Sequence, residues 1–183
     1  QPHEASYAMY APFLELIDVE VPVIGALNGH AVGGGFGLSL LCDVRIASQQ
    51  GRYGANFTRI GLHPGLAISW LLPRLVGVSQ AAELLFTGRL MDGAEMARMG
   101  LASEALPAEE VLPRALEMAA TIAANAPIAV RLTKQTFYQG LDWQPRKAAL
   151  REAFAQATTI ATEDAKEGIA ALLEKRVPDF TDK

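Results

Sequence analysis

The sequence has few of the residues on which several kinds of function depend. It holds one cysteine, Cys42, and three histidines, His3, His30 and His63, which show no metal-ligand spacing. An internal disulfide is therefore excluded, and no metal site is expected. Cys42 lies in an apolar run, which predicts a buried packing residue in a reducing, cytoplasmic compartment.

Long apolar runs and an excess of positive charge are also missing. No run of about 18 apolar residues is present, so no segment is expected to span a bilayer. The net charge of -4 argues against a nucleic-acid partner, which usually needs a basic face. The chain begins at Gln1 with neither an initiating Met nor a signal-peptide pattern, so we expect its start to be internal to a longer protein.

The composition that is present predicts a folded α/β chain. Residues 22–65 are rich in glycine and β-branched residues, whereas residues 78–176 are rich in helix formers. Strands are expected at 22–27, 44–47 and 101–106, with a further extended piece after the turn at 50–54. Helices are expected at 6–18, 35–41, 66–76, 79–86, 93–99 and 108–124, with two or three more between 127 and 176. Pro12 is expected to interrupt the first helix or to lie near its first turn.

The glycine cluster Gly33, Gly34 and Gly35 is the most informative feature of the sequence. It stands between an expected strand and an expected helix, where unpaired N–H groups can hold a phosphate or a developing oxyanion. The spacing fails for a dinucleotide loop, because the third glycine position is Leu38, and it fails for a Walker loop and a nucleophile elbow. An oxyanion donor and tight strand–helix packing both remain open.

Other polar residues favour structural roles. His30 and His63 are expected to be hydrogen-bonded loop residues, and Asp43 is expected to pair structurally with Arg45 or another neighbour. Asp92 begins an Asp-x-x-Glu pattern that is typical of a helix start. Thr162 is positioned to cap the last helix.

Several motifs stand in order along the chain. They are residues 22–35 (PVIGALNGHAVGGG), 42–47 (CDVRIA), 60–65 (IGLHPG), 72–77 (LPRLVG), 82–89 (AELLFTGR), 167–168 (EG) and 174–176 (EKR). Together they resemble the signature of the crotonase superfamily, the enoyl-CoA hydratase/isomerase group. The resemblance covers nearly the whole chain.

The resemblance implies a ClpP/crotonase-like α/β fold that lacks its N-terminal segment. A partial spiral of ββα turns is expected in residues 1–106, followed by a C-terminal helical trimerisation region in residues 107–183, within one continuous family domain. It also implies a homotrimer or a dimer of trimers. The implied substrates are acyl-CoA thioesters of fatty acid metabolism, with no cofactor besides the coenzyme A of the substrate.

The chemistry that the resemblance implies is stabilisation of a thioester enolate by two backbone N–H groups. Gly34 matches the glycine that supplies one donor, and Gly33 lies beside it in the expected substrate pocket. The other donor belongs to a Phe-x-Ala-Gly-x-Asp stretch, which these residues do not contain. Either the full protein is longer, or this form does not complete the oxyanion hole.

Two positions depart from the pattern of hydratases, which carry a glutamate at each. These positions hold Gly37 and Phe57, and neither side chain can orient water or move a proton. Standard hydration is therefore not expected, and an isomerase that relies on the second carboxylate loses its base.

Substitutes for the missing carboxylates stand near Phe57 in the sequence. Asn56 and Arg59 are pocket candidates, and His63 is the best base by residue type, because histidine changes charge near neutral pH. Lys175 matches a position from which a lysine reaches the phosphates of coenzyme A in relatives.

The sequence thus favours an acyl-CoA-processing enzyme, with several alternatives. The reaction is expected to be an enolate-type step such as isomerisation, decarboxylation or thioester hydrolysis. A second hypothesis is a catalytically inactive acyl-CoA-binding or scaffold homologue. A ClpP-like serine protease is disfavoured, because Ser39 lies in an apolar stretch without an evident histidine partner.

Overall fold

The computed structural model describes residues 2–141 and 145–183, which form two compact units. The first unit comprises residues 2–19 and 23–117. The second comprises residues 20–22, 118–141 and 145–183. The family division into 1–106 and 107–183 stays a prediction.

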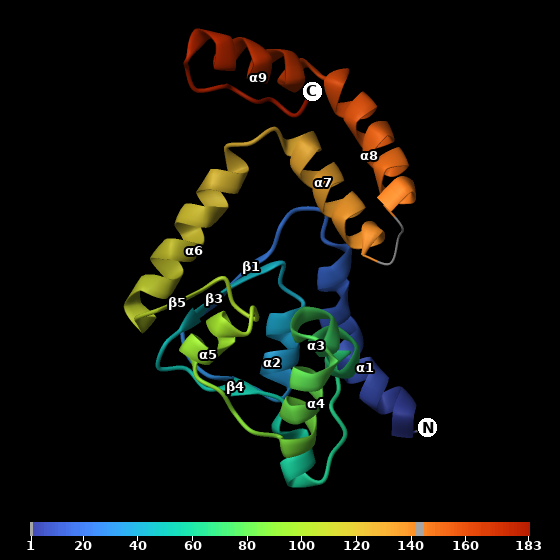
Figure 1. Ribbon diagram of the computed structural model, residues 1–183, viewed down its shortest axis with the longest axis vertical. Helices are drawn as coiled ribbons and strands as arrows, with labels where there is room; N and C mark the ends of the chain where they lie inside the picture. Colours follow the sequence, from blue (N-terminus) through green and yellow to red (C-terminus); the bar gives the residue numbers. More distant parts are fainter. Residues whose placement is uncertain (1, 142–144) are drawn as a thin grey trace. The chain divides into compact units, whose positions relative to one another are not determined.

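The strands of the first unit form two parallel ladders (Figure 1). They are β1 (Ile24–Leu27), β2 (Ala31–Val32), β3 (Val44–Ser48), β4 (Tyr53–Gly54) and β5 (Glu104–Leu106). β1, β3 and β5 pair in that order, and β2 pairs with β4. β1 and β2 lead into a helix, after which β3 pairs in parallel with β1 and β4 pairs in parallel with β2. Each parallel pairing requires a crossover connection. This arrangement confirms the expected ββα spiral.

Helices connect these strands along the chain. They are α1 (Pro2–Leu14), α2 (Gly34–Leu40), α3 (Ile68–Val76), α4 (Val78–Thr87), α5 (Gly93–Arg98) and α6 (Ala108–Ala123), with 3-10 turns at Glu15–Asp18 and at Asn56–Ile60, the latter labelled η2. The last of these helices, α6, runs from the first unit into the second. The sequence did not predict η2 or β2.

Two helix predictions were wrong in detail. α1 continues through Pro12 and ends two residues later, at Leu14. Pro12 lacks the N–H that would bond the carbonyl oxygen four residues earlier; α1 accommodates this one lost bond and ends shortly after it, so the proline neither interrupts the helix nor lies in its first turn. The helix expected from residue 66 begins at Ile68, because Leu66 and Ala67 adopt left-handed backbone conformations.

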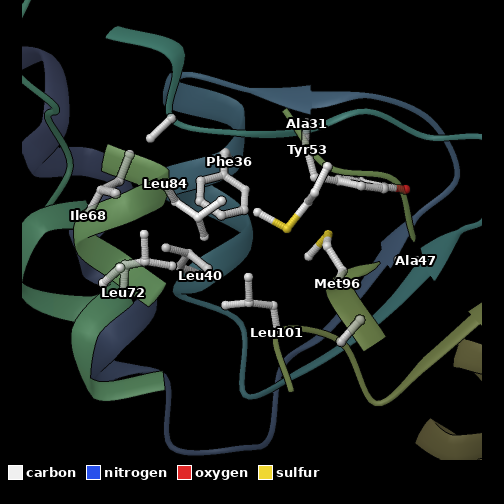
Figure 2. Packing of buried hydrophobic residues seen from close by; sticks show 14 residues of the cluster. Ala31, Phe36, Leu40, Ala47, Tyr53, Ile68, Leu72, Leu84, Met96 and Leu101 are labelled. Carbon is white, nitrogen blue, oxygen red and sulfur yellow. The ribbon is translucent and has the colours of Figure 1, made fainter. Parts of the chain in front are cut away.

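The core of the first unit lies between the helices and the strands (Figure 2). In Figure 2, Ile68 and Leu72 of α3 and Leu84 of α4 face Phe36 and Leu40 of α2. All five side chains are buried, which sets the orientation of α2 against its neighbours. The start of α2 is therefore held by packing along its length.

Buried polar groups of the first unit are matched by hydrogen bonds. The Tyr53 hydroxyl accepts from the Ser48 N–H at 3.0 Å and lies 3.0 Å from the Leu27 carbonyl oxygen. Burial raises the pKa of Tyr53, which keeps the hydroxyl protonated as a donor. The Asp43 carboxylate accepts from the Val23 N–H at 2.6 Å, so the expected structural role of Asp43 is confirmed.

The described part of the second unit contains α7 (Pro127–Gly140), α8 (Pro145–Ile160) and α9 (Glu163–Glu174). The Thr162 hydroxyl accepts from the Ala165 N–H at 3.1 Å and caps α9, as predicted. In the first unit Asp92 caps α5 in the same way, through the Glu95 N–H at 2.8 Å. The Glu95 side chain instead pairs with Arg89.

The residues after α9 fold back along that helix through charged contacts. The buried Asp164 carboxylate accepts from the backbone N–H groups of Thr181 and Asp182, at 2.7 and 2.9 Å. Arg176 binds both oxygens of Glu167 at 2.5 and 2.8 Å. A shallow pocket is lined by these groups. Because the charged side chains pair with one another, we interpret the pocket as a structural feature of the fold.

The ion pair between Glu167 and Arg176 predicts that the stability of the second unit depends on pH. Hydrogen bonds from Arg176 and from the Asp179 N–H lower the pKa of Glu167 from 4.5 to about 2. The contribution of this carboxylate to stability is therefore complete above about pH 4.5 and is lost as the pH falls toward about 2. An NMR pH titration of the Glu167 side-chain carbonyl measures this. An ordinary midpoint for Glu167 would contradict the prediction.

Candidate functional site

The glycine loop is built by strand pairing and by one left-handed residue. The Gly33 N–H donates to the Gly54 carbonyl oxygen at 2.9 Å, which continues the pairing of β2 with β4. Gly33 has φ +60°, a conformation that L side chains rarely adopt, and it turns the chain directly into α2. The Gly37 N–H then donates to the Gly33 carbonyl oxygen at 3.1 Å.

Gly34 is the first residue of α2, where the backbone N–H has no acceptor within the helix. Gly34 and Gly35 are both exposed. A Cβ atom added to either residue would meet no atom within 4 Å outside the neighbouring residues and the backbone of its own helix. The loop therefore presents backbone beside open space, which is the arrangement that an oxyanion donor needs. The donor role of Gly34 stays a prediction.

The structure brings two further predicted residues to this loop. A Cβ atom on Gly33 would lie 3.6 Å from Asn56 Oδ1 and 3.7 Å from Phe57 Cζ. Both neighbours come from η2, and the Phe57 side chain also packs against the core. The ring of Phe57 thus lies beside the glycine loop, together with one polar amide.

Gly37 is buried one helical turn after the start of the loop. A Cβ atom there would lie 3.1 Å from the Cβ of Leu66 and 3.1 Å from two side-chain carbons of Ile68. Sequence reasoning missed Leu66 and Ile68. The two left-handed residues that bring them here, Leu66 and Ala67, are neither glycine nor asparagine, so nothing marked their conformation. The environment of Gly37 is hydrocarbon.

Arg59 and His63 lie at the end of η2 and in the loop after it, and both are exposed. The aliphatic part of Arg59 packs at Gly88, beyond the end of α4. His63 Nδ1 lies 2.7 Å from the Pro64 carbonyl oxygen, so this nitrogen must carry the donated hydrogen and Nε2 is left to accept a proton. No hydrogen bond among the described residues joins His63 to the glycine loop.

The remaining predicted residues are placed as follows. His30 Nδ1 accepts from the Arg52 N–H at 2.9 Å, which confirms its role as a hydrogen-bonded loop residue. Lys175 is exposed at the end of α9, in the second unit, with φ +55°. Its contact with coenzyme A stays a prediction. Cys42 packs against Gly25, but it is only half-buried, so the prediction of a buried thiol was wrong in degree.

Comparison with known proteins adds a decisive observation to this geometry. The family model described as enoyl-CoA hydratase/isomerase matches residues 2–183. The chain belongs to the enoyl-CoA hydratase/isomerase family. The resemblance inferred from the motifs is thereby confirmed.

Individual members of this family match over most of the chain. A probable enoyl-CoA hydratase (echA8) of Mycobacterium bovis is 37% identical over 172 residues, which are 94% of this chain and 67% of the relative. A crotonyl-CoA hydratase of Syntrophomonas wolfei is 39% identical over 165 residues, 90% of this chain and 64% of the relative. The chain thus spans about two thirds of the length of these relatives.

Solved structures confirm the crotonase fold. The enoyl-CoA hydratase of Bacillus anthracis superposes with a TM-score of 0.95 at 36% identity, covering 100% of this chain and 71% of that one. An enoyl-CoA hydratase subunit of Geobacillus kaustophilus gives a TM-score of 0.92 at 33% identity, covering 100% of this chain and 72% of that one. Among the described residues, no helix is long and apolar enough to cross a membrane.

Proposed function

We propose that this family member binds acyl-CoA thioesters and stabilises their enolates at the Gly34 N–H. The observation that carries the proposal is the loop itself: Gly33 turns the chain so that Gly34 opens α2 beside free space. The family membership supplies the substrate class, because the relatives are described as hydratases of enoyl-CoA thioesters. The coenzyme A belongs to the substrate, and no separate cofactor is proposed.

The proposed step is a reversible proton transfer at carbon. A base takes the α-proton of the thioester, and the electron pair of that bond moves into the carbonyl, whose oxygen becomes negative. The Gly34 N–H donates to this oxygen. When a proton returns to the α-carbon, the α-hydrogen has been exchanged with solvent. When a proton returns instead to the γ-carbon of a β,γ-unsaturated chain, the double bond moves to the α,β position.

His63 Nε2 is the proposed base. Its other ring nitrogen is occupied by the Pro64 carbonyl oxygen, so the lone pair of the neutral ring lies on Nε2. Gly37 and Phe57 supply no carboxylate, so hydration is not part of the proposal. Lys175 is proposed to contact the phosphates of coenzyme A.

A second candidate function is acyl-CoA binding without catalysis. The two positions that depart from the hydratase pattern favour this candidate. Gly37 is enclosed by Leu66 and Ile68, and Phe57 packs against the core. This candidate keeps the substrate site and loses the base.

One experiment separates these candidates. The full gene product is titrated with butanoyl-CoA by calorimetry, and the exchange of the α-protons of butanoyl-CoA in D₂O is followed by NMR. Saturable binding with exchange that falls by about 10²-fold in a His63→Ala variant supports the enzyme. Binding without exchange supports the non-catalytic candidate. The absence of binding contradicts both.

We also propose that the protein assembles as a homotrimer or a dimer of trimers. Apolar side chains of the second unit are exposed in the single chain: Leu150, Phe154, Ile160, Ile169, Leu172 and Leu173, each at least 60% exposed. Exposed apolar side chains in such number are typical of surfaces that bind another protein.

A further inference from the structure

The turn before α3 contains two consecutive strained residues. Leu66 has φ +52° and Ala67 has φ +56°, in the left-handed region that glycine occupies without strain. Each such residue is disfavoured, because the left-handed conformation brings its Cβ atom too close to the following carbonyl oxygen. Strain of this kind persists only where the surroundings over-determine the conformation, and it is frequent at functional sites.

Contacts on two sides hold this turn. On one side Leu66 is 4% exposed and lies with the fully buried Ile68 over Gly37. On the other side the turn passes under Tyr10 of α1, because a Cβ atom on Gly65 would lie 2.3 Å from the Tyr10 hydroxyl oxygen. A side chain at position 65 would require the Tyr10 ring to move. The strained backbone therefore places the Leu66 side chain directly over the helix that carries the glycine loop.

The position that Leu66 covers is one at which hydratases of this family are expected to carry a glutamate. Any Cβ atom at position 37 would be 3.1 Å from the Leu66 Cβ, closer than the usual 3.5–4.0 Å between carbon atoms at roughly optimal separation. A carboxylate there would also lose its hydration among hydrocarbon side chains. An ordered water needs about two to four polar partners, which Leu66 and Ile68 do not offer.

We propose that Leu66 is a specificity-determining residue: held over Gly37 by the left-handed turn, it keeps this side of the glycine loop apolar, so that thioester enolates form there without addition of water. The inference rests on the proposed acyl-CoA function. It restricts the reaction to steps that consume no water, and the substrate class to saturated or β,γ-unsaturated acyl thioesters.

The packing part is tested by a double-mutant cycle on the full gene product. Gly37→Ala should raise the unfolding equilibrium constant by about tenfold in the parent, but by a smaller factor, about threefold to fivefold, in a Leu66→Gly background, where the two Ile68 carbons remain. Glycine accepts the left-handed φ and removes one of the three side-chain carbons that a Cβ atom at position 37 would meet. Leu62→Gly in the same loop is the control, because Leu62 is exposed and should leave the effect of Gly37→Ala unchanged. Additive effects of Gly37→Ala and Leu66→Gly would overturn the proposal.

The specificity part is tested with crotonyl-CoA as the probe. The double variant Gly37→Glu, Phe57→Glu should hydrate it no faster than the parent, whereas adding Leu66→Gly should raise hydration at least about tenfold. The proposal would be overturned if the double variant, which keeps Leu66, hydrated crotonyl-CoA as fast as the triple variant. It would also be overturned if a folded triple variant showed no gain in hydration over the parent. Should no variant bind butanoyl-CoA, the proposed function fails, while the double-mutant cycle still decides whether Leu66 closes position 37.

Discussion

Replacing Gly34 with proline should slow the α-proton exchange of butanoyl-CoA by about 10²–10³-fold, the usual loss when one oxyanion donor is removed. Proline has no backbone N–H, yet it is well tolerated at the first position of a helix, where Gly34 lies. A residue before proline prefers an extended conformation. Gly33, at φ +60° and ψ −121°, has the mirror image of that conformation, which glycine adopts as readily because it has no side chain. The substitution therefore removes a donor and keeps the helix.

Gly34→Ala is the matched control for this prediction. It keeps the N–H, and its Cβ atom would meet no protein atom within 4 Å. Its exchange rate should stay within about tenfold of the parent, and its stability should not fall, because alanine is the better helix former. Binding of butanoyl-CoA by calorimetry should survive in both variants. Equal rates in the proline and alanine variants would show that Gly34 is not the donor.

Replacing Arg45 with alanine should lower the free energy of unfolding by about 3–5 kcal/mol. Arg45 is 7% exposed. Its guanidinium donates to the carbonyl oxygens of Leu101 and Cys42, and to that of Ser39 at 3.4 Å. It thereby joins β3 to the end of α2 and to the segment before β5. Alanine removes the Arg45 donor from all three carbonyl groups, of which that of Ser39 keeps the Cys42 N–H at 3.2 Å, and opens a cavity beside them.

Urea unfolding followed by circular dichroism measures the effect of Arg45. Arg45→Lys retains the charge but not the forked geometry, so it should fall between the alanine variant and the parent. Arg52→Ala is the exposed control and should change stability by no more than about 0.5 kcal/mol. A loss below about 1 kcal/mol for Arg45→Ala would contradict the structural role assigned to this residue.

Much of the fold followed from local signals in the sequence. The strands at β1 and β3 were marked by β-branched runs, and the caps at Asp92 and Thr162 were identified from single residues. These signals succeed because capping and periodicity depend on residues within one or two turns. β2 and η2 were missed because each is short, and β2 exists only through its pairing with β4.

The surroundings of the glycine loop were predicted in part. The glycine cluster was placed correctly between a strand and a helix. Phe57, named from a family spacing, and Asn56, named because it is next to Phe57 in the sequence, do lie beside Gly33. The contact of Gly37 with Leu66 had no signal, since leucine and alanine ordinarily avoid left-handed conformations.

The sequence by itself determined the family, the ββα order and the absence of carboxylates at positions 37 and 57, because each of these is a matter of residue identity and spacing along the chain. Only the tertiary structure decided what surrounds those positions. The β2–β4 pairing brings η2 to Gly33, and packing of α3 against α2 brings Leu66 to Gly37. Such contacts join residues more than twenty positions apart, and they form because burying apolar surface outweighs the strain of one turn.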